Sequence, residues 1–226
     1  MIRDKEYYIN NLNVLYEDNH ILVIEKPENV LSQKDKTNDF DINEIVKEYL
    51  KRKYNKPGNV YLGLVHRLDR RVGGVMVLAK TSKAASRISI DIQKHNFDKY
   101  YIAKCQGKLD NKGSINIKIK KVDNLAIVSN DGQNAMLDYK ILYANDEYSY
   151  ALVDLLTGRY NQIRLSFSYI NHPLVGDYKY GGIKKDRIGL WCYKIRFVHP
   201  VTKELMEFIS LPKGEFWKDI EKFVKY

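Results

Sequence analysis

The sequence has few of the features that mark secreted, membrane-spanning or metal-binding proteins. Only two of its 226 residues are cysteines, and neither Cys105 nor Cys192 has a Cys or His at a spacing typical of a zinc site. Both lie in apolar stretches, which indicates buried free thiols in a reducing compartment. No apolar run reaches the ~18 residues of a membrane span, and the charged start MIRDKEYYINN is not typical of a signal peptide. We therefore expect a cytoplasmic protein that holds no metal and does not associate with a membrane.

The sequence also lacks internal repeats, low-complexity tracts and linkers rich in Gly, Ser or Pro. Its hydrophobic fraction of 44% and charged fraction of 29% are ordinary for a globular protein. A chain of this length can bury a sizeable core. We therefore interpret residues 1–226 as one domain, and we expect a monomer.

Apolar periodicity predicts mostly consecutive strands with few helices between them. Helices are expected at 41–54, 82–95, 161–170 and 215–224. Strands are expected at 13–26 (a pair broken at Asp18-Asn19), 60–65, 74–79, 100–106, 114–119, 126–128, 136–143, 148–156, 190–198 and 204–210. The first helix begins with the capping-box pattern of Asp41 and Glu44. This order predicts an α+β fold with a mixed, largely antiparallel central sheet flanked by helices.

The charge of the chain is unbalanced toward the basic side. Its net charge of +10 favours a polyanionic partner. Eight Lys and only two Asp lie between residues 94 and 121, with Tyr100 and Tyr101 among them. Cations interleaved with aromatic rings suit phosphates and unstacked bases. A solvated strand face gives the same pattern, so this window leaves both interpretations open.

The stretch His66–Gly74, HRLDRRVGG, places one carboxylate among cations between two expected strands. Nearby cations favour the ionised form of Asp69, which suits a nucleophile or a general base. A structural ion pair produces the same pattern, and the residues alone leave both alternatives open. No second acid stands in a comparable motif, and His66 without a Ser or Cys nucleophile is expected to be a structural hydrogen-bonding residue. Gly73 and Gly74 permit a positive φ before a buried strand.

A second distinctive stretch, Leu155–Gly182, is basic and punctuated by glycines. Arg159 and Arg164 are its candidates for pairing with a carboxylate or binding a phosphate. Arg164 falls within the first two turns of the expected helix 161–170.

Five motifs together resemble one family. GLVHRLDRRVGGVMVLAK is similar to the signature of the RluA-type RNA pseudouridine synthases, HRLDxxTSG followed by an apolar strand and Ala-Lys. Four further stretches resemble other family motifs in the same order: VLYEDNHILVIEKPENVLSQ, FDKYYIAKCQG, TGRYNQIRLSF and GDYKYGG with IRFVHPVTKELMEF. The resemblance covers nearly the whole chain and implies a pseudouridine synthase catalytic domain without the N-terminal S4-like domain that many relatives carry.

The resemblance also implies an activity. Uridine in RNA would be isomerised to pseudouridine without a cofactor or metal: the C1′–N1 bond breaks, the uracil turns, and a C1′–C5 bond forms. Asp69 matches the catalytic aspartate, and Arg67 matches the arginine that helps to fill the space left by the flipped nucleotide. Tyr101 matches the tyrosine that stacks on the target base, and Arg164 matches the basic residue that pairs with the aspartate. A nucleophilic and an elimination route for Asp69 remain alternatives.

The chain departs from the family pattern at positions where RNA contacts are expected. The departures are Asn29 for Gly, Gln33 for His, Val72-Gly73-Gly74 for Thr-Ser-Gly, Tyr160-Asn161 for Thr-His, and Ser166 for His. None replaces the aspartate, the tyrosine or the arginine. They leave open whether the RNA is ribosomal or transfer RNA. The alternatives to the enzyme are an inactive RNA-binding or ribosome-assembly protein on the same scaffold and a hydrolase of nucleosides or sugars.

Overall fold

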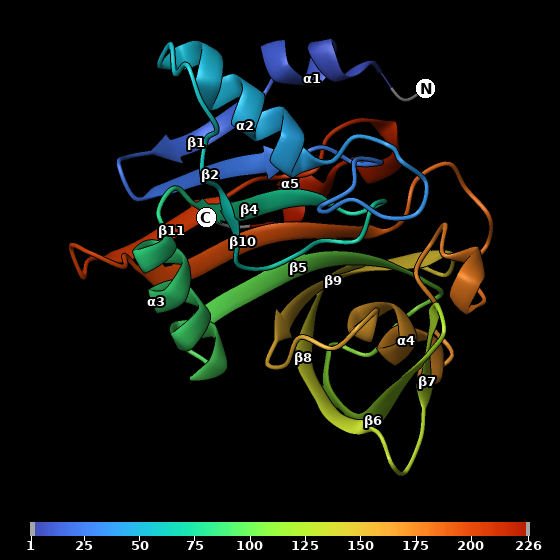
Figure 1. Cartoon of the computed structure of the whole chain (residues 1–226). Helices are drawn as coiled ribbons and strands as arrows, with labels where there is room; N and C mark the ends of the chain where they lie inside the picture. The colour runs from blue at the N-terminus through green and yellow to red at the C-terminus, as the bar shows by residue number, and fades with distance from the viewer. Residues whose placement is uncertain (1–2, 225–226) are drawn as a thin grey trace. The chain divides into compact units, whose positions relative to one another are not determined.

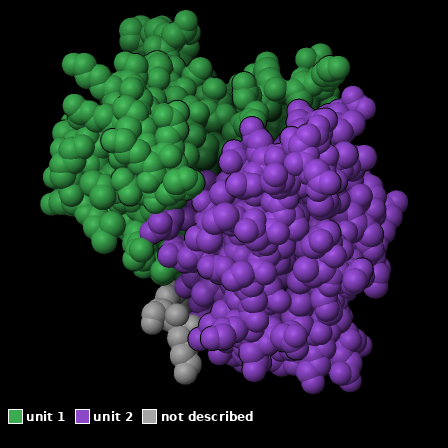
Figure 2. All heavy atoms as spheres, turned by 90° about the horizontal axis from the view of Figure 1, so that it is seen from below, with its two compact units in different colours: residues 1–97, 194–210 green, residues 98–193, 211–226 purple. Residues whose placement is uncertain are grey.

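The computed structural model describes residues 3–224 of the chain (Figure 1). Contacts divide the chain into two compact units, which Figure 2 colours separately. Unit 1 consists of residues 1–97 and 194–210, and unit 2 of residues 98–193 and 211–226. The chain passes between them three times: inside β5 (Phe97–Gln106), inside β10 (Leu190–Val198) and after Ser210. No helix in the described range is long and apolar enough to cross a membrane.

Unit 1 is built on short antiparallel strands and three helices. The strands are β1 (Asn13–Glu17), β2 (Ile21–Lys26), β3 (Gly63–Leu64), β4 (Gly73–Ala79) and β11 (Leu205–Ile209), and the helices are α1 (Lys5–Asn10), α2 (Ile42–Lys53) and α3 (Ser82–Gln93). Strand β2 lies between β1 and β4, while β11 pairs with the end of β10. The predicted turn at Asp18-Asn19 is confirmed, because it joins β1 to β2.

Helix α2 covers the β1 and β2 side of unit 1 (Figure 1). The Asp41 side chain accepts the backbone N–H of Glu44, so the predicted N-terminal cap is confirmed. The helix buries one apolar face against side chains of β2 and β4; the buried members are Leu22, Ile24, Ile42, Ile45, Val46, Leu50, Met76 and Leu78. This packing holds β2 and the loop that follows it in a fixed position.

Unit 2 is a curved antiparallel sheet around one helix (Figure 1). Its strands follow the order β5–β9–β8–β6–β7, with β6 at Lys112–Val122, β7 at Leu125–Val128, β8 at Gln133–Ala144 and β9 at Tyr148–Leu155. Helix α4 (Gln162–Tyr169) lies inside the curve and buries Phe167. Along β6, isoleucines at alternate positions are buried, and the polar residues between them, Asn116 and Lys118, are exposed.

The structure confirms the α+β class and the mostly antiparallel sheet, and it corrects some elements. The expected helix 215–224 is two short pieces, a 3-10 turn at Glu215–Trp217 and α5 at Ile220–Phe223. Asp219 between them has a φ of 63°, which a continuous helix does not allow. Strand β3 has two residues instead of the expected six. Helix α1, capped by Asp4, is not predicted by the apolar pattern.

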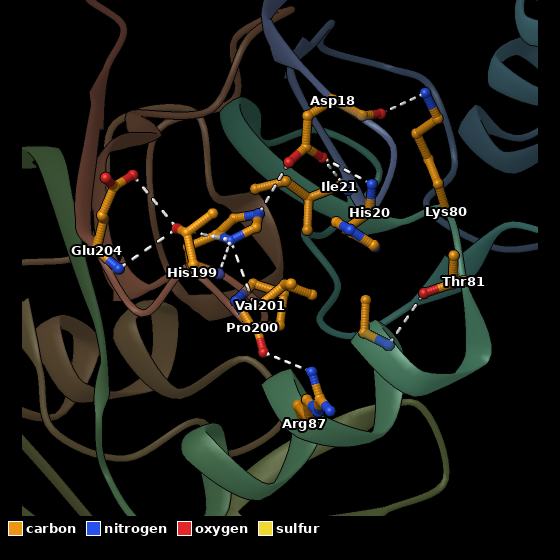
Figure 3. Close-up of polar contacts among 12 residues, drawn as sticks. Asp18, His20, Ile21, Lys80, Thr81, Arg87, His199, Pro200, Val201 and Glu204 are labelled. Carbon is orange, nitrogen blue, oxygen red and sulfur yellow. Dashed lines mark hydrogen bonds and ion pairs between the residues drawn. The ribbon is translucent and has the colours of Figure 1, made fainter.

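A buried polar network fixes the turn between β1 and β2 (Figure 3). His199 Nε2 lies 3.0 Å from Asp18 Oδ2, while His199 Nδ1 accepts the N–H of Thr202 at 2.9 Å. Asp18 Oδ1 accepts the N–H groups of His20 and Ile21, both at 2.7 Å. Burial raises the pKa of Asp18, but these two hydrogen bonds and the neighbouring His199 together hold it below its usual value.

We expect Asp18→Ala to reduce the free energy of unfolding by about 1–3 kcal/mol near neutral pH, because two backbone donors lose their acceptor. Since folding lowers the pKa of Asp18, this stabilisation is fully present above the unfolded-state value of about 3.9 and is lost as the pH falls through the folded-state value. Urea unfolding at several pH values measures it, with Asp91→Ala on α3 as the control. A difference from wild type that does not shrink in acid would contradict this assignment.

Candidate active site

Asp69 lies in the turn between β3 and β4 and is partly exposed. Its Oδ1 accepts the N–H of Arg71 at 3.0 Å, and its backbone carbonyl accepts the N–H of Val72 at 3.0 Å. An aspartate that hydrogen-bonds the backbone two residues ahead forms an Asx turn, which orients its side chain. The turn therefore presents the carboxylate in a defined direction at the surface of unit 1.

The backbone beside Asp69 is anchored by Ser32. The Ser32 hydroxyl donates to the carbonyl of Leu68 at 2.6 Å and accepts the N–H of Leu68 at 3.1 Å. Ser32 and Leu68 are both buried. Both polar groups of the residue preceding Asp69 are thus fixed by one side chain from the loop after β2.

Lys26 provides a second anchor from the end of β2. Its side chain is fully buried, and its Nζ donates to the carbonyl oxygens of Pro27 at 2.9 Å, Val30 at 2.7 Å and Arg70 at 3.4 Å. An ammonium group has three N–H donors, so the three carbonyls can satisfy all of them. Burial lowers the pKa of Lys26 to about 7, although the negative charges of Asp69 and Glu28 oppose the shift. Lys26 therefore joins the loop after β2 to the residue that follows Asp69.

Sequence reasoning gave Lys26 no role. The signal was present, because a lysine that ends the apolar run ILVIE and precedes a proline stands where a core residue is expected. The hydrogen bond from Lys26 to Arg70 spans 44 positions, so it could not be inferred from local pattern.

The neighbours of Asp69 have separate partners. Arg70 is paired with Asp39 at 2.6 Å. Arg67 is exposed and reaches Gln33 Oε1 at 3.5 Å. The predicted structural role of His66 is confirmed, because its Nε2 accepts the N–H of Val77 at 3.0 Å.

The glycine pair that follows Asp69 includes one residue with a positive φ. Gly74 has a φ of 121°, which side chains other than glycine rarely adopt. It is paired with Lys26 across the β2–β4 ladder. The predicted positive φ is therefore confirmed, and it lies opposite the lysine that holds the Asp69 turn.

Tyr101 lies in β5 of unit 2 with 6% of its surface exposed. Burial, and then the neighbouring Cys192 thiol, raise the pKa of Tyr101 well above its usual value. Burial raises the pKa of Cys192 to about 12, although its hydrogen bond with Tyr101 opposes the shift. Cys105 and Cys192 are both buried free thiols, which confirms that part of the sequence prediction.

Arg164, in the first turn of α4, forms a buried bidentate ion pair. Its Nε donates to Asp177 Oδ2 at 2.7 Å and its Nη2 donates to Asp177 Oδ1 at 2.6 Å. The exposed fractions of the two side chains are 7% and 0%. Its Nη1 reaches Asn161 Oδ1 at 3.4 Å. The predicted pairing of Arg164 with Asp69 would join the two units and stays a prediction.

Sequence reasoning missed Asp177. The only signal was an acid between glycines in the stretch GDYKYGG, for which the family resemblance implied no role. Because Asp177 is fully buried against Arg164, it fixes the direction of the guanidinium. Within residues 3–224, no group of three His, Cys, Asp or Glu side chains is placed to hold a metal ion.

Comparisons with known proteins identify the family. The model of the family described as RNA pseudouridylate synthase matches residues 20–169. An uncharacterized RNA pseudouridine synthase of Bacillus subtilis (strain 168), YjbO, is 33% identical over 223 residues, which cover 95% of this chain and 76% of that protein. Ribosomal large subunit pseudouridine synthase D of Vibrio cholerae is 33% identical over 222 residues, which cover 87% of this chain and 66% of that protein.

Two solved human structures share the fold. RNA Pseudouridylate Synthase Domain Containing 4 has a TM-score of 0.78 at 19% identity and covers 94% of each chain. RNA Pseudouridylate Synthase Domain Containing 1 has a TM-score of 0.72 at 23% identity and covers 94% of this chain and 86% of that one.

The family model and the named relatives define this α+β protein as an RNA-modifying isomerase. The chain belongs to the RNA pseudouridylate synthase family.

We expect Lys26→Met to become less stable relative to wild type as the pH rises. The folded-state pKa of about 7 lies below the unfolded-state value of about 10.4, so the stability of the wild type rises with pH between these two values. Methionine does not titrate, so the difference in unfolding free energy should widen between about pH 7 and pH 9.5. Urea unfolding at both pH values measures the change. Lys83→Met, on the exposed face of α3, is the control, and a Lys26→Met difference that is equal at both pH values would contradict the lowered pKa of Lys26.

We expect Asp177→Ala to reduce the free energy of unfolding by about 3–5 kcal/mol, because the buried guanidinium of Arg164 loses both hydrogen bonds to the Asp177 carboxylate. Asp186→Ala, an exposed acid in the same loop, should change it by less than about 0.5 kcal/mol. Chemical denaturation of both variants measures the two losses. Similar losses in the two variants would mean that the buried pair does not stabilise this loop.

Proposed function

We propose that the chain converts uridine to pseudouridine in structured RNA and that Asp69 is the carboxylate that acts on the ribose. The observation that carries the proposal is the Asp69 turn: a partly exposed carboxylate that accepts the N–H of Arg71, between two neighbours, Leu68 and Arg70, whose backbones are held by Ser32 and Lys26. Preorganised groups of this kind lower the cost of reaching a reactive geometry.

The proposed reaction breaks and forms bonds within one nucleotide and exchanges protons with solvent. The C1′–N1 bond breaks, the freed uracil turns, and a C1′–C5 bond forms. C5 then loses its proton to solvent and N1 takes one up. Asp69 acts at the ribose, either by addition to C1′ or as the base of an elimination.

The other three predicted site residues have supporting roles in this proposal. The target base must leave its stack, which costs a few kcal/mol. Arg67 is exposed beside Asp69 and would fill the space that the flipped nucleotide vacates. Tyr101 would contact the target base, and its low exposure favours contact through a limited part of the ring. Arg164, oriented by Asp177, would pair with Asp69.

The substrate we propose is ribosomal or transfer RNA in the cytoplasm, bound by a monomer of this chain. The net charge of +10 suits a polyanion. One relative is named a ribosomal large subunit pseudouridine synthase, so large-subunit rRNA is the first substrate to test.

The test compares Asp69→Asn with wild type on RNA carrying a tritium label at C5 of uridine. Asparagine keeps the acceptor for the Arg71 N–H and removes the carboxylate. We expect tritium release to fall by on the order of 10⁴-fold, a loss typical for the removal of a reacting group. RNA affinity should remain within about threefold, because the turn is preserved.

The matched control is Asp39→Asn, a carboxylate that is paired with Arg70 in the same region. It should retain tritium release. Turnover by Asp69→Asn at the wild-type rate would contradict the assignment. Wild-type protein that binds RNA but releases no label from rRNA or tRNA would instead favour an inactive RNA-binding protein.

A further inference from the structure

A groove of about 360 Å³ opens beside Arg67 in unit 1. Its lining residues come from the loop after β2, the start of α2 and the β3 segment: Gln33, Asn43, Leu62, Leu64, Val65, His66 and Arg67. The volume lies at the lower end of the range of about 300–1,000 Å³ that is typical of small-molecule pockets. A single nucleotide is a ligand of suitable size.

The groove combines apolar walls with carboxamide groups. Leu62 is buried, and Leu64 and Val65 are partly buried, so their side chains offer an apolar surface to a planar base. Gln33 and Asn43 supply the polar groups. This composition is that of a base-recognition pocket, since apolar contact and stacking give affinity and amides read the edge of the base.

Asn43 has an unused hydrogen-bonding group. Its Oδ1 is buried and accepts no hydrogen bond from any residue in the described range. An unsatisfied buried acceptor destabilises the folded state, and a ligand N–H bonded to it would recover that loss. The neighbouring cap is already complete, because Asp41 accepts the N–H groups of Glu44 and Lys34. The free Asn43 oxygen therefore has no evident part in holding α2.

Arg67 is the residue that the groove shares with the proposed catalytic turn. It lines the groove and stands two positions before Asp69. Since Arg67 is proposed to replace the flipped uridine in the stack, a groove that it borders is placed to receive the nucleotide next to that uridine. This step rests on the function proposed above.

We propose that this groove is a specificity subsite for one nucleotide adjacent to the target uridine, and that it selects a base with an exocyclic amino group, adenine above all. The base lies against Leu64 and Val65, and its amino group donates to Asn43 Oδ1 once the side chain turns this buried oxygen toward the groove. Adenine is favoured because a carboxamide can accept from its N6 amino group and donate to its N7. Uracil has no exocyclic amino group and is disfavoured.

The experiment first maps the uridine that the wild-type protein modifies in rRNA and tRNA. A transcript of that site, with both neighbouring positions randomised, is then treated with each variant, and pseudouridine is quantified by sequencing for every neighbour. The wild type should prefer adenine over uracil at one neighbouring position by about 5- to 150-fold, the range that one bidentate contact provides.

Two substitutions at one position then separate recognition from general damage. Asn43→Ala should reduce the preference to below about twofold, because it removes both carboxamide groups. Asn43→Asp keeps an acceptor and loses the donor, so it should shift the preference from adenine to cytosine. Gln93→Ala removes an exposed carboxamide from α3 and should leave the wild-type preference intact.

The outcomes distinguish this subsite from the proposed function. An active wild type with no neighbour preference, or with a preference unchanged in Asn43→Ala, overturns the subsite and leaves the activity standing. A wild type that modifies no RNA overturns the activity. In that case, selection of bound oligonucleotides from the randomised pool decides the subsite: enrichment of adenine that Asn43→Ala abolishes supports it, and no enrichment overturns it.

Discussion

The side-chain ammonium of Lys26 lies in the interior of unit 1, where it donates to three backbone carbonyls. A buried charge is costly unless every donor is satisfied, so these carbonyls must stay in place for the lysine to remain inside. That requirement couples the loop after β2 to the turn that carries Asp69. Ser32 strengthens the coupling from the same loop, since it binds both backbone groups of Leu68. The direction of the Asp69 carboxylate follows from these two side chains and its own Asx turn.

Asp69 and Arg164 lie in different units, and in each unit the site residue is held in place in a similar way. In each unit, a fully buried ionisable group, Lys26 or Asp177, holds the more exposed part of the site through several hydrogen bonds. Breaking such a contact leaves an uncompensated buried group, which is more destructive than losing a surface ion pair. Each buried group thus fixes a site residue of its own unit, and of the residues proposed to meet RNA, Arg67 is exposed and Asp69 is partly exposed.

Sequence patterns predicted the elements whose signals are local. The cap at Asp41, the turn at Asp18-Asn19 and the positive φ at Gly74 depend on a few adjacent residues. The supporting contacts of the site were not predictable in this way. Lys26 reaches Arg70 across 44 positions, and Arg164 meets Asp177 across 13 positions. The C-terminal helix was overestimated, because an apolar period alone does not reveal that Asp219 adopts a left-handed conformation.

This structure explains only some of the positions at which the chain departs from the family pattern. Gln33, which replaces a histidine of the family pattern, lines the groove beside Arg67, whereas Gly74 matches the family's glycine and supplies the backbone conformation opposite Lys26. The most direct test of the central claim is a map of pseudouridine in the RNA of cells with and without the gene for this chain. We predict that at least one uridine of rRNA or tRNA loses its modification when the gene is absent and regains it with the wild-type gene. Identical maps from the two cell types would contradict the account.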